Sequence, residues 1–158
     1  MATPLTPIWN ITGANWVDNQ PNKRFAIYSS GTGDAVLDKE TRLVWERSPS
    51  ANAQGWDGAI VYAYAKKTAG RMGWRLPVIE ELLSLVDPTQ ANPSLPVGHP
   101  FLNVQTNNFY WSSTLGMSTP PTYAWGYNFG TGDISNVLKT AAEYTWLVRG
   151  GYGHDYPF

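Results

Sequence analysis

Residues 73–87 read GWRLPVIEELLSLVD and hold the pattern on which the expected fold depends. Pro77 suits the first position of a helix, where its missing N–H loses no hydrogen bond. Glu80 and Glu81 then complement the positive N-terminal end of that helix. The apolar residues behind them recur at helical spacing and form an expected core-facing stripe of Val78, Ile79, Leu82, Leu83 and Val86. The stretch therefore predicts a helix that starts at Pro77 and is stopped by Pro88.

The paired glutamates raise the question of catalysis, because two carboxylates can act as general acid and base. Adjacent helical residues diverge by about 100° around the helix axis, so Glu80 and Glu81 do not converge on one substrate. The helix dipole already accounts for both residues. We interpret them as solvated charges of the first turn.

Two arginines lie beside apolar residues and could bind an anion. Arg75 follows a tryptophan, and Arg149 follows a valine. We favour a structural interpretation, in which each guanidinium bonds loop carbonyls or pairs with a carboxylate. Asp87 and Glu46 are the expected partners.

The segments before this stretch predict another helix and three strands. Residues 56–69, WDGAIVYAYAKKTA, carry apolar residues at helical spacing, and Gly70 stands where a left-handed C-cap is wanted. The alternation of residues 24–28 predicts a strand. Residues 35–37 and 43–45 predict two more strands, joined by a polar hairpin turn.

The segments after this stretch predict strands only. Their expected bounds are 109–113, 123–129, 134–138 and 145–149. Tyr123, Trp125, Tyr127 and Phe129 share one face of their strand by the period of two. Because strands, two helices and further strands follow one another without alternation, we expect an α+β fold with two helices packed on small antiparallel sheets.

Composition restricts the possible functions. The 158 residues are enough for one domain, and we expect an N-terminal arm over residues 1–22 and a single domain over 23–158. The net charge of -1 gives no field to attract nucleic acid. Cysteine is absent, which excludes disulfides and thiolate chemistry. No apolar run is long enough to cross a bilayer and no signal peptide is recognisable, so we expect no membrane insertion.

Five motifs occur in the order found in a known family. They are LDKETRLVWE at 37–46, WRLP at 74–77 leading into EELLSLVD at 80–87, YWSST at 110–114, AW at 124–125 through NF at 128–129 with Gly130 and Gly132, and VRGG at 148–151. Together they resemble the Lcl C-terminal domain family, which is named for the C-terminal domain of a bacterial collagen-like adhesin. The resemblance covers about residues 24–151, and ordered motifs are more specific than any one of them.

The resemblance implies a C-type-lectin-like fold, related also to the formylglycine-generating enzymes, in which a small mixed sheet and two helices support a loop-rich ligand face. Related domains serve as surface adhesins or as the variable binding proteins of diversity-generating retroelements. The resemblance therefore implies a binding role, in an extracellular or cell-surface setting. Family members often carry cysteines that this chain lacks, so the formylglycine-generating chemistry is not carried over.

Metal, cofactor and enzyme sites lack the residues they need. His99 and His154 are the only histidines, and two alone do not complete a zinc site. Residues 20–22, Gln-Pro-Asn, match the sugar-specifying tripeptide of C-type lectins, but they precede the first strand and no Trp-Asn-Asp follows, so we expect no calcium. Ser112 and Ser113 lack a G-x-S-x-G elbow, and there is no phosphate-binding loop. We expect no cofactor and no enzymatic activity.

The aromatic residues divide into an expected core and an expected ligand surface. The core tryptophans are Trp45, Trp56, Trp74, Trp111 and Trp146. The candidate ligand-binding residues, expected to be exposed, are Tyr123, Trp125, Tyr127, Asn128, Tyr144, Tyr152, His154, Asp155 and Tyr156. Tyr, Trp and Asn make adaptable recognition surfaces, although aromatics at a period of two also pack against helices.

Two functions are consistent with these features. The first is a non-enzymatic recognition domain, adhesin-like or retroelement-diversified, that binds a protein or a glycan. The second is a structural or assembly module that forms homo-oligomers through its aromatic face. An enzyme would need buried titratable residues that converge in a pocket, which the sequence does not predict.

Overall fold

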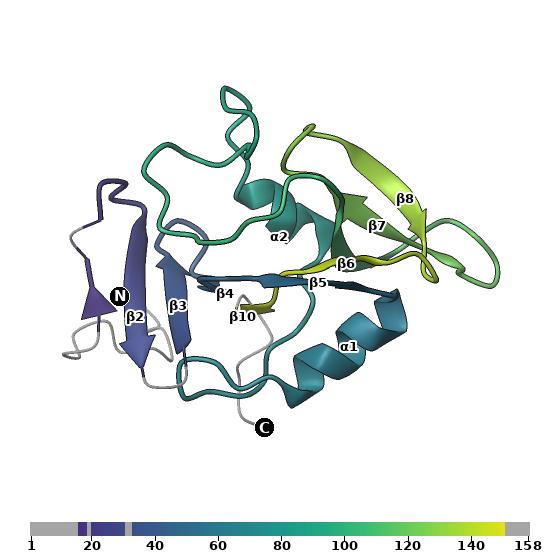
Figure 1. The fold of residues 1–158 in the computed structure, drawn as a ribbon, viewed down its shortest axis with the longest axis horizontal. Coiled ribbons are helices and arrows are strands. Elements are labelled where there is room, and N and C mark those ends of the chain that lie inside the picture. Colours follow the sequence, from purple (N-terminus) through teal and green to yellow (C-terminus); the bar gives the residue numbers. More distant parts are fainter. Residues whose placement is uncertain (1–15, 19, 31–32, 151–158) are drawn as a thin grey trace, which may run out of the picture.

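The computed structural model describes residues 16–18, 20–30 and 33–150 and has ten strands and two helices among them (Figure 1). The strands are β1 (Trp16–Val17), β2 (Phe25–Ser30), β3 (Gly33–Asp38), β4 (Val44–Glu46), β5 (Ser50–Gln54), β6 (Tyr110–Leu115), β7 (Tyr123–Tyr127), β8 (Ile134–Leu138), β9 (Glu143–Thr145) and β10 (Val148–Arg149). The helices are α1 (Trp56–Ala65) and α2 (Ile79–Ser84). The predicted α+β class is confirmed.

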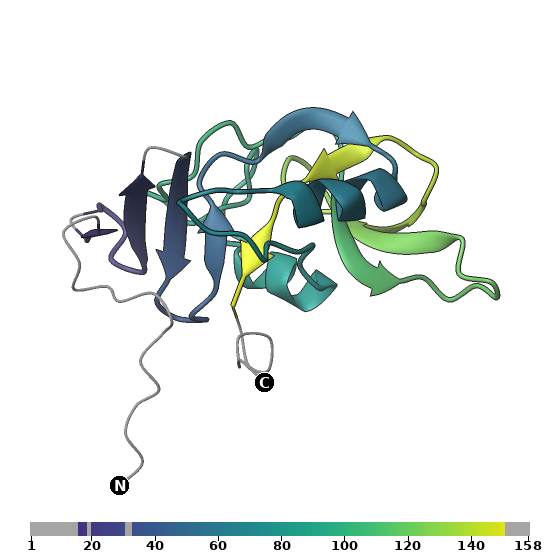
Figure 2. The same cartoon turned by 90° about the horizontal axis from the view of Figure 1, so that it is seen from below.

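The strands form two five-stranded sheets. The first sheet has the order β1-β2-β3-β4-β10 and the second the order β5-β9-β6-β7-β8. Neighbours run antiparallel except β6 and β9, which pair in parallel at Tyr110 and Tyr144. The expectation of purely antiparallel sheets is therefore wrong at this one place. Figures 1 and 2 show the β7–β8 hairpin at the end of the molecule opposite β2 and β3.

The predicted strand over residues 145–149 is wrong, because the chain changes sheets within it. β9 belongs to the second sheet and β10 to the first. Between them, Trp146 and Leu147 are fully buried and bind Glu46 at the end of β4. The Trp146 indole donates to the Glu46 carbonyl at 2.9 Å, and the Leu147 N–H donates to the Glu46 carboxylate at 3.1 Å. The four apolar or β-branched residues from Thr145 to Val148 did not reveal this crossing.

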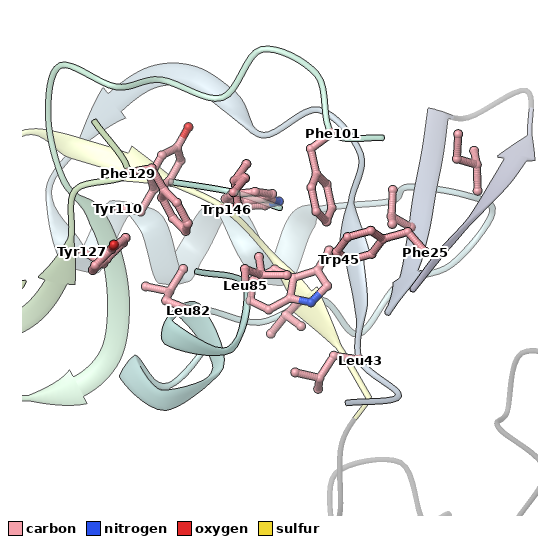
Figure 3. Close-up of a cluster of buried hydrophobic side chains, with 14 residues drawn as sticks. Phe25, Leu43, Trp45, Leu82, Leu85, Phe101, Tyr110, Tyr127, Phe129 and Trp146 are labelled. Carbon is pink, nitrogen blue, oxygen red and sulfur yellow. The ribbon is translucent and has the colours of Figure 1, made fainter. Parts of the chain in front are cut away.

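Two buried clusters lie on opposite faces of the sheets. Tyr110 and Trp111 are neighbours on β6 yet belong to different clusters, because adjacent strand residues point to opposite faces. The cluster beside α2 includes Phe25, Trp45, Leu82, Leu85, Phe101, Tyr110, Tyr127, Phe129 and Trp146 (Figure 3). The cluster beside α1 includes Ala26, Val44, Ala59, Ala63, Trp74, Trp111, Ala124 and Leu147. Both clusters draw on both sheets, so one continuous body supports the surface described below.

Four of the five expected core tryptophans are buried, which confirms that assignment. They are Trp45, Trp74, Trp111 and Trp146. Trp56, at the start of α1, is only half-buried. Its indole donates to the Ser112 carbonyl at 2.8 Å, and the Lys139 ammonium lies 4.0 Å from the centre of its ring.

Helix α2 begins two residues later than predicted. Arg75 still pairs with Val148 as a strand bridge, which keeps the chain extended through Pro77. The N-cap is Val78, whose N–H is accepted by the Glu81 carboxylate at 2.9 Å. Pro77 therefore precedes the helix, and Val78 is exposed rather than part of the core stripe. Glu81 is a capping residue, so only Glu80 is the solvated charge that was expected of both.

Helix α1 ends at Ala65, short of the predicted Gly70 cap. Lys66 leaves the helix with extended backbone angles, φ -70° and ψ 131°. Its ammonium lies 2.9 Å from the Glu46 carboxylate and donates to the Tyr62 hydroxyl at 2.6 Å. These contacts draw the chain toward β4. Gly70 has the expected positive φ of 72° but serves the turn that follows.

Candidate functional site

One face of the β7–β8 hairpin is open to solvent. We name it the β7–β8 face and define it by five side chains, namely Tyr123, Trp125, Ile134, Asn136 and Leu138. Tyr123 pairs with Leu138, and Trp125 pairs with Asn136, across the two strands. Tyr123 is 37% exposed, and Ile134 and Leu138 are each 48% exposed. Large apolar side chains thus alternate with an amide on the same surface.

The opposite face of the hairpin is covered. Ala124 is fully buried in the cluster beside α1, and Val137 packs against it. Because the strand period is two, Tyr123 and Trp125 must then point away from α1. The side of the hairpin toward α1 is therefore packed. On the other side α2 packs near Tyr127 and leaves the end at Tyr123 open.

Gly116 holds the outer end of the β7–β8 face in place. Its N–H donates to the Tyr123 carbonyl at 2.8 Å. A Cβ at position 116 would come within 2.5 Å of the Asn136 side-chain oxygen and 2.7 Å of the Tyr123 Cβ. Only glycine fits this close approach, so the loop backbone packs against these two side chains and restricts their positions.

Two candidate residues that were expected to be exposed are buried. Tyr127 is 3% exposed and packs edge-on against Phe129, with ring centroids 4.7 Å apart, in the cluster beside α2 (Figure 3). Asn128 is 7% exposed, and its side-chain oxygen accepts the N–H groups of Gly130 and Thr131. The expected exposure is wrong for both, because Tyr127 fills the core and Asn128 shapes the turn between β7 and β8.

The remaining candidates do not join this surface. Tyr144 is half-buried on β9, and its hydroxyl donates to the Asn107 side-chain oxygen at 3.0 Å. Buried Tyr110 and Tyr127 lie between it and β8 in the sheet. The other four candidates, Tyr152, His154, Asp155 and Tyr156, lie outside the described residues.

A pocket of about 470 Å³ adjoins the β7–β8 face. Leu83, Val86 and Pro88 line it from α2 and the segment that follows, and Ile134 lines it from β8. Ile134 thus belongs to both the pocket and the face. Ser94 and Tyr127 also line the pocket, and their hydroxyls lie 3.0 Å apart.

Part of this site was predicted from the sequence. It placed Tyr123 and Trp125 on one strand face, but it overlooked Ile134, Asn136 and Leu138. The signal was present, since residues 134–138 were a predicted strand after a predicted hairpin turn, and pairing across that turn sets these three opposite the aromatics. The pocket joins segments far apart in the chain and carries no local signal.

The buried carboxylates are engaged in structural bonds. Glu46 is 1% exposed, and its oxygens contact the Lys66 ammonium and the Leu147 N–H. Burial raises the pKa of Glu46, and the Lys66 charge opposes that rise. Burial also raises the pKa of Glu143, whose carboxylate accepts the Phe109 N–H at 3.1 Å. These groups anchor the backbone and do not face the pocket.

Asp38 is fully buried in the first sheet and is satisfied in the same way. Arg24 contacts both of its oxygens, at 2.8 and 2.6 Å, and Thr41 donates its hydroxyl to one of them. The burial of this carboxylate is therefore explained by its partners, without a catalytic role.

Arg75 serves the fold rather than an anion site. Its two terminal nitrogens each lie 2.7 Å from a Glu81 oxygen, and it also donates to the Gly150 carbonyl at 2.8 Å. For Arg75 the predicted bonds to loop carbonyls are confirmed, and its carboxylate partner is Glu81 rather than Asp87 or Glu46. The extended backbone before α2 brings Glu81 within reach.

Metal ligands do not gather in the described part of the chain. No group of three or more His, Cys, Asp or Glu side chains there could hold an ion. His99 is half-buried and stacks on Phe101, with ring centroids 5.9 Å apart, and burial lowers its pKa.

Neither described helix is long and apolar enough to cross a membrane.

The sequence model of the Lcl C-terminal domain matches residues 34–149, which is more than half of the chain. The chain belongs to the Lcl C-terminal domain family. This confirms the predicted family, over slightly fewer residues than the motifs suggested. Lcl C-terminal domains are adhesin-like and are not a known enzyme family. No functionally curated protein matches the chain.

Proposed function

We propose that this Lcl C-terminal domain is a non-enzymatic recognition module of the cell surface that binds a protein or glycan ligand through the β7–β8 face. The observation that carries the proposal is the exposure of Tyr123, Ile134 and Leu138 on a strand pair whose other side is packed at buried Ala124 and partly buried Val137. Exposed apolar side chains gathered on one rigid face are typical of binding sites.

The charge distribution supports a binding surface that does not depend on ions. Asp133 is the one charged residue between Tyr110 and Leu138. The polar contacts that the β7–β8 face can offer are the Tyr123 hydroxyl, the Trp125 indole N–H and the Asn136 amide. Aromatic bodies with polar tips suit ligands that are partly apolar and partly hydrogen-bonding.

The test is a glycan array and a displayed peptide library, each probed with the labelled domain at two salt concentrations. We expect a ligand whose binding changes little with salt and is lost in Tyr123→Ala and Trp125→Ala. Tyr64→Ala is the matched control, because Tyr64 is 77% exposed on α1. Equal loss of binding in the control would overturn the assignment of the face.

A retroelement-diversified protein is a narrower form of the same proposal. Diversified positions must tolerate many side chains. Exposed Tyr123 and half-buried Trp125 meet this requirement better than Tyr127, which is 3% exposed. The genomic neighbourhood tests this form: a reverse transcriptase gene and a near-duplicate of the 3′ end that differs at adenines would support it. Their absence would eliminate diversification and leave the recognition role unaffected.

An assembly module is the second candidate, and the position of β8 favours it. β8 is the last strand of the second sheet, and among the described residues its outer edge pairs with nothing. Such an edge can pair with a second copy of the chain. Light scattering over a hundredfold range of concentration would show stable oligomers if this candidate is right, and a monomer throughout if it is wrong.

A further inference from the structure

We propose that the pocket beside the β7–β8 face holds one uncharged sugar ring, so that the ligand of this surface is a neutral glycan. The inference rests on the proposed recognition function and narrows its ligand class. The volume of about 470 Å³ falls within the usual range of ligand pockets, about 300–1,000 Å³.

The pocket has an apolar wall on two sides. Leu83 and Val86 are half-buried residues of α2 and its C-terminal end, and Ile134 faces them from β8. Pro88 completes this wall. A pyranose ring presents C–H groups on its faces, and burying them against aliphatic side chains contributes favourably.

The floor of the pocket is polar. Ser94 is 4% exposed and Tyr127 is 3% exposed, so both hydroxyls are withdrawn from bulk water. The hydrogen bond between them uses one of their two O–H hydrogens. The other hydrogen and the remaining lone pairs are available to a ligand hydroxyl, which can both donate and accept.

The rim adds further uncharged polar groups. Thr131 contributes a hydroxyl, and Gln90 contributes an amide. A purely apolar ligand, such as the aliphatic side chain of a peptide, would remove these groups from water without replacing their hydrogen bonds. A sugar satisfies the walls and the polar groups together.

The charges around the pocket disfavour an anionic sugar. Among the described residues no charged side chain lines it, and the residues next to its lining in sequence include Asp87 and Asp133. Hydrogen bonds from Thr89 lower the pKa of Asp87, so this carboxylate is ionised at neutral pH. A sulfated or sialylated ring would find no cation in the lining.

The experiment uses the whole chain on a glycan array that carries neutral hexose and N-acetylhexosamine oligosaccharides beside sialylated and sulfated ones. The strongest neutral glycan is then titrated by calorimetry against Ser94→Ala, Tyr127→Phe and Ile134→Glu. We expect about a tenfold loss of affinity from each hydroxyl removal. Tyr64→Phe and Ser48→Ala remove exposed hydroxyls elsewhere and should bind as the native chain does.

Folding is checked for each variant by its thermal midpoint, because Ser94 and Tyr127 are buried. Ile134 is 48% exposed, so Ile134→Glu tests the pocket without burying a charge. Strongest binding to sulfated or sialylated glycans would overturn the inference and leave the recognition function standing. The inference would also be overturned if a neutral glycan bound all three pocket variants as well as the native chain but did not bind Trp125→Ala.

The failure of the wider proposal gives a different result. If no glycan binds but a peptide from the displayed library binds through Tyr123 and Trp125, the sugar inference is wrong and the recognition function holds. If neither library yields a ligand, both are wrong.

Discussion

Tryptophan and tyrosine occur in two contrasting regions of this domain. In the core, Trp146 lies edge-on to Trp45 and Phe101, with ring centroids 5.6 and 4.9 Å apart. On the β7–β8 face, Tyr123 is exposed and Trp125 is half-buried, although their strand belongs to the second sheet, which also contributes to the core. The difference arises from what lies opposite each strand. A second sheet and α2 cover the core rings, whereas the outer part of the hairpin is contacted by the loop at Gly116 and stays partly open.

The two regions also differ in charge. Around the core, acidic and basic side chains are paired, as in Arg24 with Asp38 and Lys66 with Glu46. The β7–β8 hairpin has hydroxyl, amide and aromatic groups instead, with Asp133 as its single charge. We therefore expect stability and recognition to depend on largely separate residues, which substitutions can distinguish. Tyr127 is common to both, since it lies in the core cluster and also lines the pocket.

The largest expected effect is in the core. Trp146→Ala should lower the free energy of unfolding by about 4 kcal/mol, because it leaves a cavity among four aromatic rings and loses the bond to the Glu46 carbonyl. Trp125→Ala should lower it by less than about 1 kcal/mol. Urea denaturation followed by fluorescence measures both, and equal losses would contradict the separation of the two regions.

The next effect concerns the pair of Lys66 and Glu46. Lys66→Ala leaves the Glu46 carboxylate, which is 1% exposed, without its cationic partner. We expect the free energy of unfolding to fall by roughly 2–3 kcal/mol at pH 7. This is less than for a fully buried pair, because Lys66 itself is partly exposed. Lys67→Ala, one residue along and exposed, is the control and should cost less than about 0.5 kcal/mol.

The same substitution has a defined pH dependence. Burial already holds the pKa of Glu46 above its ordinary value, and removing Lys66 takes away the charge that opposes this. A carboxyl group with a raised folded-state pKa favours folding when protonated, so the variant should recover stability as the pH falls from 7 toward 5. A deficit that stays constant over this range would show that Glu46 is not the cause.

A smaller effect is expected at the start of α2. Glu81→Gln should lower the free energy of unfolding by about 1–2 kcal/mol. It removes the negative charge of the carboxylate that lies 2.7 Å from the Arg75 guanidinium and accepts the Val78 N–H. Glu80→Gln changes the adjacent exposed residue and should cost a few tenths of a kcal/mol, as a dipole effect alone. Similar values for the two would mean that the Arg75 pair contributes little.

The smallest effect on stability is expected on the β7–β8 face. Leu138→Ser replaces a side chain that is 48% exposed and should change the free energy of unfolding by about 0.5 kcal/mol or less. Its effect on ligand binding, measured with the array ligand, should be far larger. A variant that unfolds easily and still binds would reverse the roles that we assign to the two regions.

The sequence predicted those features that depend on local periodicity. Residues 134–138 were a predicted strand and are β8. The helical spacing of apolar residues within 56–69 predicted a helix, and Ala59 and Ala63 of α1 are buried. Periodicity failed where a distant partner decides the conformation. Lys66 ends α1 because of Glu46 on β4, and Arg75 stays extended because of Val148 on β10.

The candidate site was half predictable for the same reason. A period of two placed Tyr123 and Tyr127 on one face, but it carries no information about which end of the strand α2 covers. β5 was missed altogether, because SANAQ alternates polar residues only with small, exposed alanines and holds no β-branched or aromatic residue. The strand is defined instead by its pairing with β9.

The change of sheets between Thr145 and Val148 has a consequence for synthesis of the protein. β9 belongs to the second sheet and β10 to the first. Both sheets therefore lack a strand until the last segment of the described chain has been made. The bond from Leu147 to Glu46 spans 101 residues. While residues 143–149 are still inside the ribosome, β4 and β6 each have one edge without a paired strand. The two sheets can pack against each other only after Trp146 and Leu147 have emerged.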